Sequence, residues 1–356
     1  MKKIAIVGTV GLPANYGGFE TLVEYLTKET EFKDVQYSVF CSKPSYSQKG
    51  KKHNGAKLIY LPFKANGYQS IIYDIISILW SLFIADTILI LGVSGAIILP
   101  FIRPFYKGRI VTNIDGLEHR RDKWGNSVRK FLKFSEKLAV KFSNLIVTDN
   151  KAIQDYVKDE YAKNSVLIAY GADHVNSIEL SVKIRSKYDL PTKYAFKVCR
   201  IEPENNVHVI LEAFSKLSMD LVIIGNWNKS QYGIDIRDKY SINSNIMMLD
   251  PIYDQNQLNQ IRSNCSLYVH GHSAGGTNPS LVEAMYLSLP VFAFDVRYNR
   301  YTTNNEALYF KEVDDLISLV NRLMESDLKF IGNEMKVIAE KNYTWEIISQ
   351  KYLDCF

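Results

Sequence analysis

The sequence predicts an α/β protein with two doubly wound, Rossmann-like domains that face each other across a cleft. Short β-rich runs alternate with longer helical patterns, which is typical of parallel βαβ units. The alternation pauses at a polar stretch, residues 175–193, and then restarts. A chain of 356 residues is long for one domain and comfortable for two.

The first half contains five expected strands and three expected helices, and it ends near residues 166–174 in a further strand and a glycine turn. Phe19, Leu22, Val23 and Leu26 are spaced as on one buried helix face, which places a helix at 18–29. The other helices are expected at 69–85 and 127–142, and the strands at 4–7, 36–41, 87–91, 110–114 and 145–148.

The second half repeats this order. A helix is expected at 207–217, and strands at 196–199, 220–225, 246–250, 266–270 and 290–294. The expected organisation is an N-terminal domain at 1–174, a linker at 175–193, a C-terminal domain at 194–335 and closing helices at 336–356. These last helices are expected to pack back across the junction of the domains.

The composition is that of a soluble or peripheral protein in a reducing compartment. Hydrophobic residues make up 47% and charged residues 23%. Four cysteines lie far apart, without the spacing of a zinc site or a disulfide frame. In the apolar segment 68–102, Asp74, Asp86 and Gly92 interrupt any run of the roughly 20 residues that cross a bilayer. Glycines and a proline in the N-terminal run argue against a signal peptide.

Positive charge is concentrated in one segment. The net charge is +5, and residues 119–141 alone hold eight Lys or Arg against two Asp or Glu. On the expected helix, the lysines at 130, 133, 137 and 141 lie on one face. This pattern indicates an anionic membrane surface or a phosphate-bearing partner, and it also fits a solvated outer helix. Nucleic acid is disfavoured, since no recognisable nucleic-acid module accompanies the patch.

Ligands of parallel sheets bind at the carboxyl ends of strands, so the loops there are candidate sites. The clearest is HGHSAGGTNPSLVEAM, residues 270–285. Asn278 is expected to cap a helix, free N–H groups at the helix start would bind phosphate, and Glu283 would accept hydrogen bonds from a ribose. The alternative is a well-capped helix with a carboxylate that the helix dipole favours.

Three further loops carry candidate residues. In residues 198–214, Arg200 would pair with phosphate oxygens, or else form ion pairs with Glu202 or Glu204. Residues 112–124 place polar groups that would hold a hydroxyl, a phosphate or an anionic acceptor: Asp115, His119, Arg120 and Arg121. The opening loop, GTVGLPANYGG, lacks the GxGxxG of a tight dinucleotide turn, which favours a longer loop reaching over a cleft.

Together these stretches resemble the family 4 type retaining glycosyltransferases of the GT-B fold. GLPANYGGFET, NIDGLEHRRDKW, RIEPENN and HGHSAGGTNPSLVEAM are similar to the bacterial rhamnosyltransferase branch, which uses dTDP-L-rhamnose. Two positions depart from the wider family: Gly275 stands where many members have a sugar-handling Glu, and Asn206 where many have a diphosphate-binding Lys. His272, Thr277 and Asn278 are expected to take over those contacts.

The resemblance implies transfer of a sugar with retention, without a protein nucleophile and without a metal or other cofactor. Arg200 and the backbone near Gly276 and Thr277 would stabilise the departing diphosphate. Asp115 would orient the donor or the acceptor. The backbone N–H groups of Gly17 and Gly18 would approach the diphosphate, and Asn15 and Tyr16 would border the acceptor.

The implied co-substrate is dTDP-L-rhamnose, and the implied acceptor is a lipid-linked saccharide of bacterial surface polysaccharide synthesis. The expected location is the cytoplasm, peripheral on the inner face of the cytoplasmic membrane. Other readings remain open: a UDP- or GDP-sugar donor, a non-transferring epimerase of the same fold, and a catalytically silent membrane scaffold. An NAD-dependent oxidoreductase or epimerase would need a GxGxxG with an acidic ribose ligand, which the sequence lacks.

Overall fold

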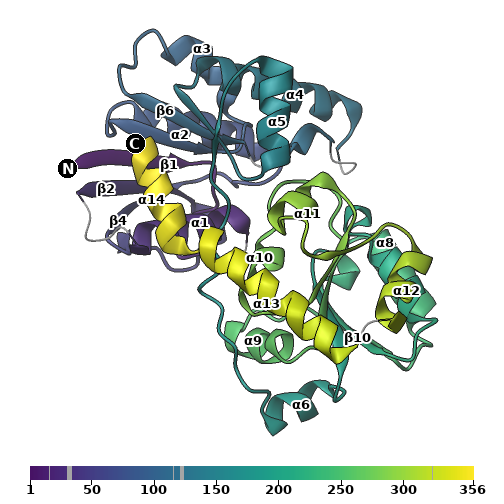
Figure 1. The fold of residues 1–356 in the computed structure, drawn as a ribbon. Helices are drawn as coiled ribbons and strands as arrows, with labels where there is room; N and C mark the ends of the chain where they lie inside the picture. Colours follow the sequence, from purple (N-terminus) through teal and green to yellow (C-terminus); the bar gives the residue numbers. More distant parts are fainter. Residues whose placement is uncertain (16, 30–33, 115, 121–123, 323) are drawn as a thin grey trace. The chain divides into compact units, whose positions relative to one another are not determined.

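The computed structural model describes residues 1–15, 17–29, 34–114, 116–120, 124–322 and 324–356. The chain forms two compact units, traced in Figure 1. Unit 1 contains residues 1–170 and 345–356, and unit 2 contains residues 171–344. Each unit is a doubly wound α/β structure, so the predicted fold class is confirmed.

Unit 1 is built on a sheet with the order β3-β4-β2-β1-β5-β6-β7-β8. Only the β3–β4 pair is antiparallel among its described pairs. The strand order reverses between β1 and β5, which creates a switch point where ligands of such sheets bind. The strands are β1 (Lys2–Val7), β2 (Val35–Ser42), β3 (Lys52–His53), β4 (Ala56–Leu61), β5 (Thr87–Leu91), β6 (Arg109–Ile114), β7 (Leu145–Thr148) and β8 (Val166–Leu167).

Helices cover this sheet because their apolar faces match its buried strands. Every residue of β5 is buried, and α1 buries Leu22, Val23 and Leu26 as predicted. The predicted helix at 69–85 is regular only to Ser81, where i→i+3 bonds tighten the last turn. The helices are α1 (Gly18–Glu29), α2 (Gln69–Ser81), α3 (Leu99–Ile102), α4 (Asn126–Phe142), α5 (Lys151–Tyr161) and α14 (Trp345–Cys355).

The C-terminal helix α14 packs against α1 within unit 1 (Figure 1). The ring of Trp345 stacks on Tyr25 with centroids 4.7 Å apart. Further along, the buried amide of Asn113 at the end of β6 donates to the Tyr352 hydroxyl over 2.7 Å. A stacked aromatic pair and a buried polar contact thus hold the end of the chain on the first unit.

Unit 2 repeats the same plan with parallel strands in the order β11-β10-β9-β12-β13-β14. In chain order within the unit this is 3-2-1-4-5-6, and its switch point lies between β9 and β12. The strands are β9 (Tyr194–Val198), β10 (Asp220–Ile224), β11 (Ile246–Leu249), β12 (Leu267–His270), β13 (Val291–Phe294) and β14 (Leu308–Phe310).

One face of this sheet packs on a core that includes α7, α8 and α12. Trp227 and Phe214 are among its largest fully buried side chains. The helices are α6 (Val182–Tyr188), α7 (Val207–Phe214), α8 (Gln231–Tyr240), α9 (Gln255–Ser263), α10 (Pro279–Tyr286), α11 (Arg297–Thr302), α12 (Val313–Arg322) and α13 (Glu325–Asn342).

The segment expected as a linker, 175–193, lies within unit 2. Its polar side chains are used in contacts with α9: Ser181 donates from both its N–H and its hydroxyl to Gln260. The closing helices divide between the units, α13 with unit 2 and α14 with unit 1. The sequence reading also lacked the β3–β4 pair and α5.

Among the residues that the structure describes, no helix is long and apolar enough to cross a membrane. The apolar segment 68–102 contains α2, β5 and α3 instead.

We expect the substitution Tyr352→Phe to lower the free energy of unfolding by roughly 1–3 kcal/mol, because it leaves the buried Asn113 amide without its acceptor. Tyr68→Phe removes the same hydroxyl from a residue that is 85% exposed and should change stability by less than about 0.5 kcal/mol. Urea unfolding of the full chain measures both. Equal stabilities for the two variants would contradict the role assigned to this contact.

Candidate functional site

At the switch point of unit 2, the loop after β9 and the loop after β12 are tied to each other. The Asn206 amide donates to the Gly271 carbonyl over 2.8 Å. The Nδ1 atom of His272 lies 2.6 Å from Asn205 Oδ1. Ser273 donates from its N–H and its hydroxyl to the Glu204 carbonyl, each over 2.9 Å. These contacts hold residues 204–206 against residues 271–273, and the Asn205 amide also donates to the Arg200 carbonyl over 2.7 Å.

The guanidinium of Arg200 lies near two carboxylates without donating a hydrogen bond to any described residue. Its nitrogens are 3.5 Å from Glu202 and 3.9 Å from Glu204. These separations are beyond those of a strong hydrogen bond. Arg200 therefore forms the ion pairs with Glu202 and Glu204 that the sequence suggested as an alternative. Its side chain is 31% exposed, so its N–H groups stay available to a phosphate.

The two positions that depart from the wider family have structural explanations. Gly275 has φ = +114°, a conformation that residues with a side chain rarely adopt, so a Glu would be strained there. Asn206 has φ = +47° at the start of α7 and uses its amide to hold Gly271. Its side chain fixes the two loops relative to each other.

Asn278 caps α10, as predicted, through a bond from the Ser280 N–H to its side chain. The prediction of free N–H groups in the first turn of α10 is wrong. Pro279 has no N–H, and the N–H groups of Leu281 and Val282 donate to the Asn278 carbonyl. The backbone N–H groups that donate to no described residue lie just before the helix, at Ala274, Gly275 and Gly276. Thr277, beside them, is buried.

Glu283, one turn inside α10, is held by two basic side chains of the same unit. Arg262 of α9 forms an ion pair with its Oε2, and His174 Nε2 lies 3.1 Å from its Oε1. Asn259 accepts from the Arg262 Nε over 2.9 Å and orients the guanidinium. Burial acts to raise the pKa of Glu283, but Arg262 and His174 outweigh burial and lower that pKa to about 2. The carboxylate is thus ionised and fixed in direction.

Two basic side chains of the unit 2 sheet, His270 and Lys197, are buried. His270, at the end of β12, is 2% exposed, and its Nε2 has no hydrogen-bond partner among the described residues. Burial lowers the pKa of His270 well below its usual value, and the neighbouring Lys197 and His272 lower it further. The imidazole of His270 is therefore neutral at pH 7.

In unit 1, side chains of α1 hold the long opening loop. Glu20 accepts from the Thr9 hydroxyl over 2.9 Å and from the Val10 N–H over 2.7 Å. Glu24 accepts from the Ala14 N–H over 2.9 Å. Gly17 has φ = +133°, and a Cβ there would lie 1.9 Å from Glu20 Oε2. The loop is thus long because it folds back onto its own helix.

The loop after β6 joins α4 and α5 around one buried carboxylate, Glu136. His119 Nδ1 lies 3.0 Å from Glu136 Oε2, and the hydroxyls of Tyr156 and Tyr161 each donate to Oε1 over 2.6 Å. The Arg120 guanidinium stacks over the Tyr156 ring at 4.7 Å. Burial acts to raise the pKa of Glu136, but the bonds from His119 and the tyrosines outweigh it and lower that pKa.

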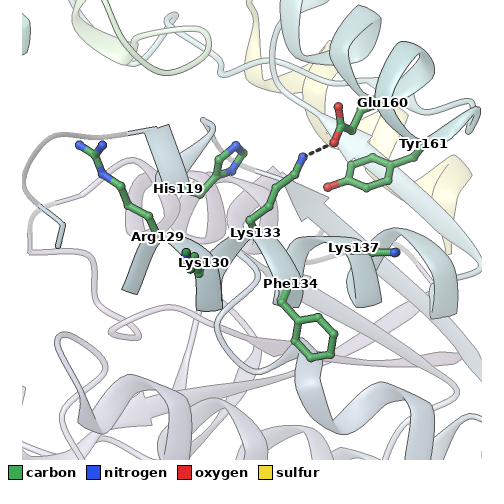
Figure 2. Close-up of a pocket in the computed structure, with 8 residues that line it drawn as sticks. All are labelled: His119, Arg129, Lys130, Lys133, Phe134, Lys137, Glu160 and Tyr161. Atoms are coloured by element: carbon green, nitrogen blue, oxygen red, sulfur yellow. Dashed lines mark ion pairs between the residues drawn. The ribbon is translucent and has the colours of Figure 1, made fainter. Parts of the chain in front are cut away.

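A surface pocket of about 560 Å³ is lined in part by three residues that contact Glu136: His119, Lys133 and Tyr161 (Figure 2). Its wall is mostly basic, and Figure 2 shows Lys133 reaching toward Glu160 beside the Tyr161 ring. The lining residues are His119, Arg129, Lys130, Lys133, Phe134, Lys137, Glu160 and Tyr161.

The predicted site residues are divided between the two units, and three of them lie outside the described residues. Tyr16, Asp115 and Arg121 lie outside the described residues. Gly17, Gly18 and the exposed Asn15 belong to unit 1, as do His119 and Arg120, whereas the other donor-side residues belong to unit 2. Arg262, His174 and Glu136 were missed, because they act through partners far away in the sequence. No group of three or more His, Cys, Asp or Glu side chains in the described part of the chain is placed to hold a metal ion.

Two protein families match the chain. Residues 181–345 match the glycosyl transferases group 1, and residues 1–173 match the domain of unknown function DUF1972. Protein CapJ of Staphylococcus aureus is 24% identical over 199 residues, 54% of this chain and 49% of CapJ. The chain thus spans about half the length of this curated relative.

Solved structures share the fold over nearly the full chain. Sucrose-phosphate synthase of Thermosynechococcus elongatus has a TM-score of 0.81 at 13% identity, over 99% of this chain and 98% of that one. Anabaena HepE in complex with UDP-glucose has a TM-score of 0.73 at 13% identity, over 99% of both chains. The chain therefore has the GT-B fold, and the group 1 match supports a glycosyltransferase.

Replacing Glu283 by Gln should destabilise the protein at pH 7 by about 3–5 kcal/mol, because Arg262 is left buried without a counter-charge. The pKa of Glu283 lies at about 2 in the folded protein, below the usual 4.5, so its carboxylate stabilises the fold above pH 4.5. That stabilisation is lost as the pH falls toward 2. The gap between wild type and Glu283→Gln should therefore narrow between pH 4.5 and pH 2.

Differential scanning calorimetry at pH 7 and pH 3 measures this gap. The control is Glu306→Gln, an exposed glutamate of the same unit without an ion pair among the described residues. A gap that stays the same at both pH values would refute the ionised pair.

Proposed function

We propose that this GT-B protein, whose residues 181–345 match the group 1 glycosyl transferases, is a retaining rhamnosyltransferase. It moves L-rhamnose from dTDP-L-rhamnose to a lipid-linked saccharide in bacterial surface polysaccharide synthesis. The observation that carries this is the switch-point cluster of unit 2. There, the guanidinium of Arg200 and the backbone N–H groups of residues 274–276 donate no hydrogen bond to a described residue. The ionised Glu283 lies one turn inside α10, the helix that follows this loop.

Each of these groups binds a different part of the sugar nucleotide. The diphosphate binds Arg200 and the loop backbone, which offer charge-assisted and backbone hydrogen bonds. The ribose hydroxyls donate to Glu283, whose oxygens each retain a lone pair beside Arg262 and His174. His272, Asn206 and Asn278 keep the loops in position and contact the sugar side, and Thr277 borders it.

In the reaction, the bond between the sugar C1 and the phosphate oxygen breaks, and its electron pair passes to the diphosphate. The acceptor hydroxyl forms the new bond to C1 on the same face, and its proton passes to the departing phosphate oxygen. Arg200 stabilises the negative charge that grows on that oxygen. We assign Asp115 to orienting the reacting partners and the N–H groups of Gly17 and Gly18 to binding the diphosphate, and the proposed reaction requires no metal.

The rhamnosyl assignment is supported by the branch-specific motifs around residues 11–21, 113–124, 200–206 and 270–285. A UDP-sugar is the second candidate, because the similar HepE of Anabaena was solved with UDP-glucose. A GDP-sugar, an epimerase reaction or a silent scaffold are the further outcomes of a donor test.

The acceptor side lies in unit 1. Asn15, Tyr16, His119, Arg120 and Arg121 border the saccharide. The lysine face of α4 meets the anionic inner surface of the cytoplasmic membrane. Exposed aromatic rings on two packed helices, Phe134 of α4 and Phe101 of α3, support interfacial contact.

We expect dTDP-L-rhamnose to be bound and consumed with a lipid-linked acceptor, with and without EDTA. Arg200→Ala should lower turnover by about 10²–10³-fold, since it removes charge stabilisation from the leaving group. Arg237→Ala removes an arginine that pairs with Asp250 on the surface of unit 2 and should leave turnover unchanged. Product release measured by chromatography of the nucleotide is the assay.

Consumption of a UDP- or GDP-sugar in place of dTDP-L-rhamnose would reject the rhamnosyl assignment. Unchanged turnover in Arg200→Ala would reject the donor site, and the absence of turnover with every sugar nucleotide would favour the scaffold.

Liposome flotation tests the membrane contact. Wild-type protein should float with anionic vesicles at low salt and dissociate as the salt concentration rises. Lys137→Ala/Lys141→Ala should weaken the partition about tenfold or more, at roughly 1 kcal/mol for each lysine. Lys57→Ala/Lys158→Ala removes two exposed lysines from elsewhere in unit 1 and should weaken it less. Vesicle binding that does not change with salt concentration, or an equal loss of binding in both double variants, would contradict membrane contact by the lysine face of α4.

A further inference from the structure

Among the residues that the structure describes, two lysines in the wall of the unit 1 pocket have no counter-charge. Lys130 and Lys137 are exposed, and no carboxylate of the described residues lies within ion-pair distance of either. They are seven positions apart on α4, so they lie on the same face of the helix, two turns apart. The pocket therefore presents two uncompensated positive charges along one wall.

Between them, Lys133 is fixed by protein contacts. Its Nζ lies 2.7 Å from Glu160 Oε1 and also contacts the Tyr156 hydroxyl. Burial acts to lower the pKa of Lys133, but the bonds to Glu160 and Tyr156 outweigh it and raise that pKa. Lys133 is thus a permanently charged, oriented group in the pocket wall.

The negative charge beneath the pocket is enclosed. The Glu136 side chain is 2% exposed and accepts from the two tyrosine hydroxyls, with His119 and Lys133 also within ion-pair distance. The exposed carboxylate at the rim, Glu160, is engaged by Lys133. A ligand in the pocket therefore meets cations, which favours an anion with more than one negative charge.

An apolar group lies beside these cations. Phe134 follows Lys130 by one helical turn and is 56% exposed in the pocket lining (Figure 2). Inorganic phosphate has no apolar surface that could pack on this ring. A phosphate ester of a hydrocarbon chain would bury the ring and gain free energy from that burial. The pocket has a volume of about 560 Å³ and opens widely to solvent, so a phosphate group can enter it while an attached chain extends outward.

We propose that this pocket binds the phosphate groups of an isoprenoid-type lipid diphosphate, the anchor of the acceptor saccharide. Lys130 and Lys137 contact the phosphate oxygens, Lys133 fixes their position, and Phe134 covers the first hydrocarbon unit. The assignment rests on the proposed function in taking the acceptor to be lipid-linked.

The test is a titration of the full-length protein with geranyl diphosphate, without vesicles and with dTDP at saturation to occupy the donor site. Wild-type protein should bind, and Lys130→Ala/Lys137→Ala should bind at least tenfold more weakly. Lys57→Ala/Lys158→Ala loses the same charge from unit 1 outside the pocket and should stay within twofold of wild type. Thermal unfolding confirms that the variants are folded.

An unchanged affinity in Lys130→Ala/Lys137→Ala, or an equal loss in both double variants, would overturn the proposal. Inorganic pyrophosphate is the second ligand: binding as tight as that of geranyl diphosphate would assign the pocket to free anions and overturn the lipid assignment. Because no sugar is transferred in this titration, failure of rhamnosyl transfer leaves its result standing.

Discussion

The reversal of strand order in each parallel sheet is the constraint on which the site depends. In unit 2 the chain leaves β9 and β12 in opposite directions, so the loops after these strands border one crevice. Contacts between Asn206 and Gly271, and between Asn205 and His272, then fix the loops against each other. Arg200 and the glycine-rich backbone can serve one ligand because the sheet has already placed them together.

Each unit also holds a glutamate among donors from distant segments of the chain. Glu283 in unit 2 is held by Arg262 and His174, and Glu136 in unit 1 by His119 and two tyrosines. In both, partner contacts outweigh burial, and the pKa falls. A buried carboxylate satisfied in this way fixes its neighbours without making the surface above it negative. This suits sites that receive phosphate groups.

The two departures from the wider family follow the same logic. A backbone with φ = +114° at Gly275 would strain the Glu that many family members have there, and the amide of Asn206 holds a loop where many members have a charged Lys. In unit 2, the hydrogen-bond donors left over for an anion are therefore those of Arg200 and of the backbone N–H groups at residues 274–276. The neutral contacts of Asn205 and Asn206 fix the positions of the two loops that carry these donors.

The sequence by itself determined features that depend on local spacing: most strands and helices, though not the β3–β4 pair or α5, together with the Asn278 cap and the lysine face of α4. It also indicated Arg200 and the loop at 270–285 as a phosphate site. Only the tertiary structure decided that the first-turn N–H groups of α10 are occupied, that Glu283 pairs with Arg262, and that α14 packs on unit 1. Helical and strand periodicity arises from neighbours within a few residues, whereas these contacts join segments far apart in the chain, and no local pattern records them.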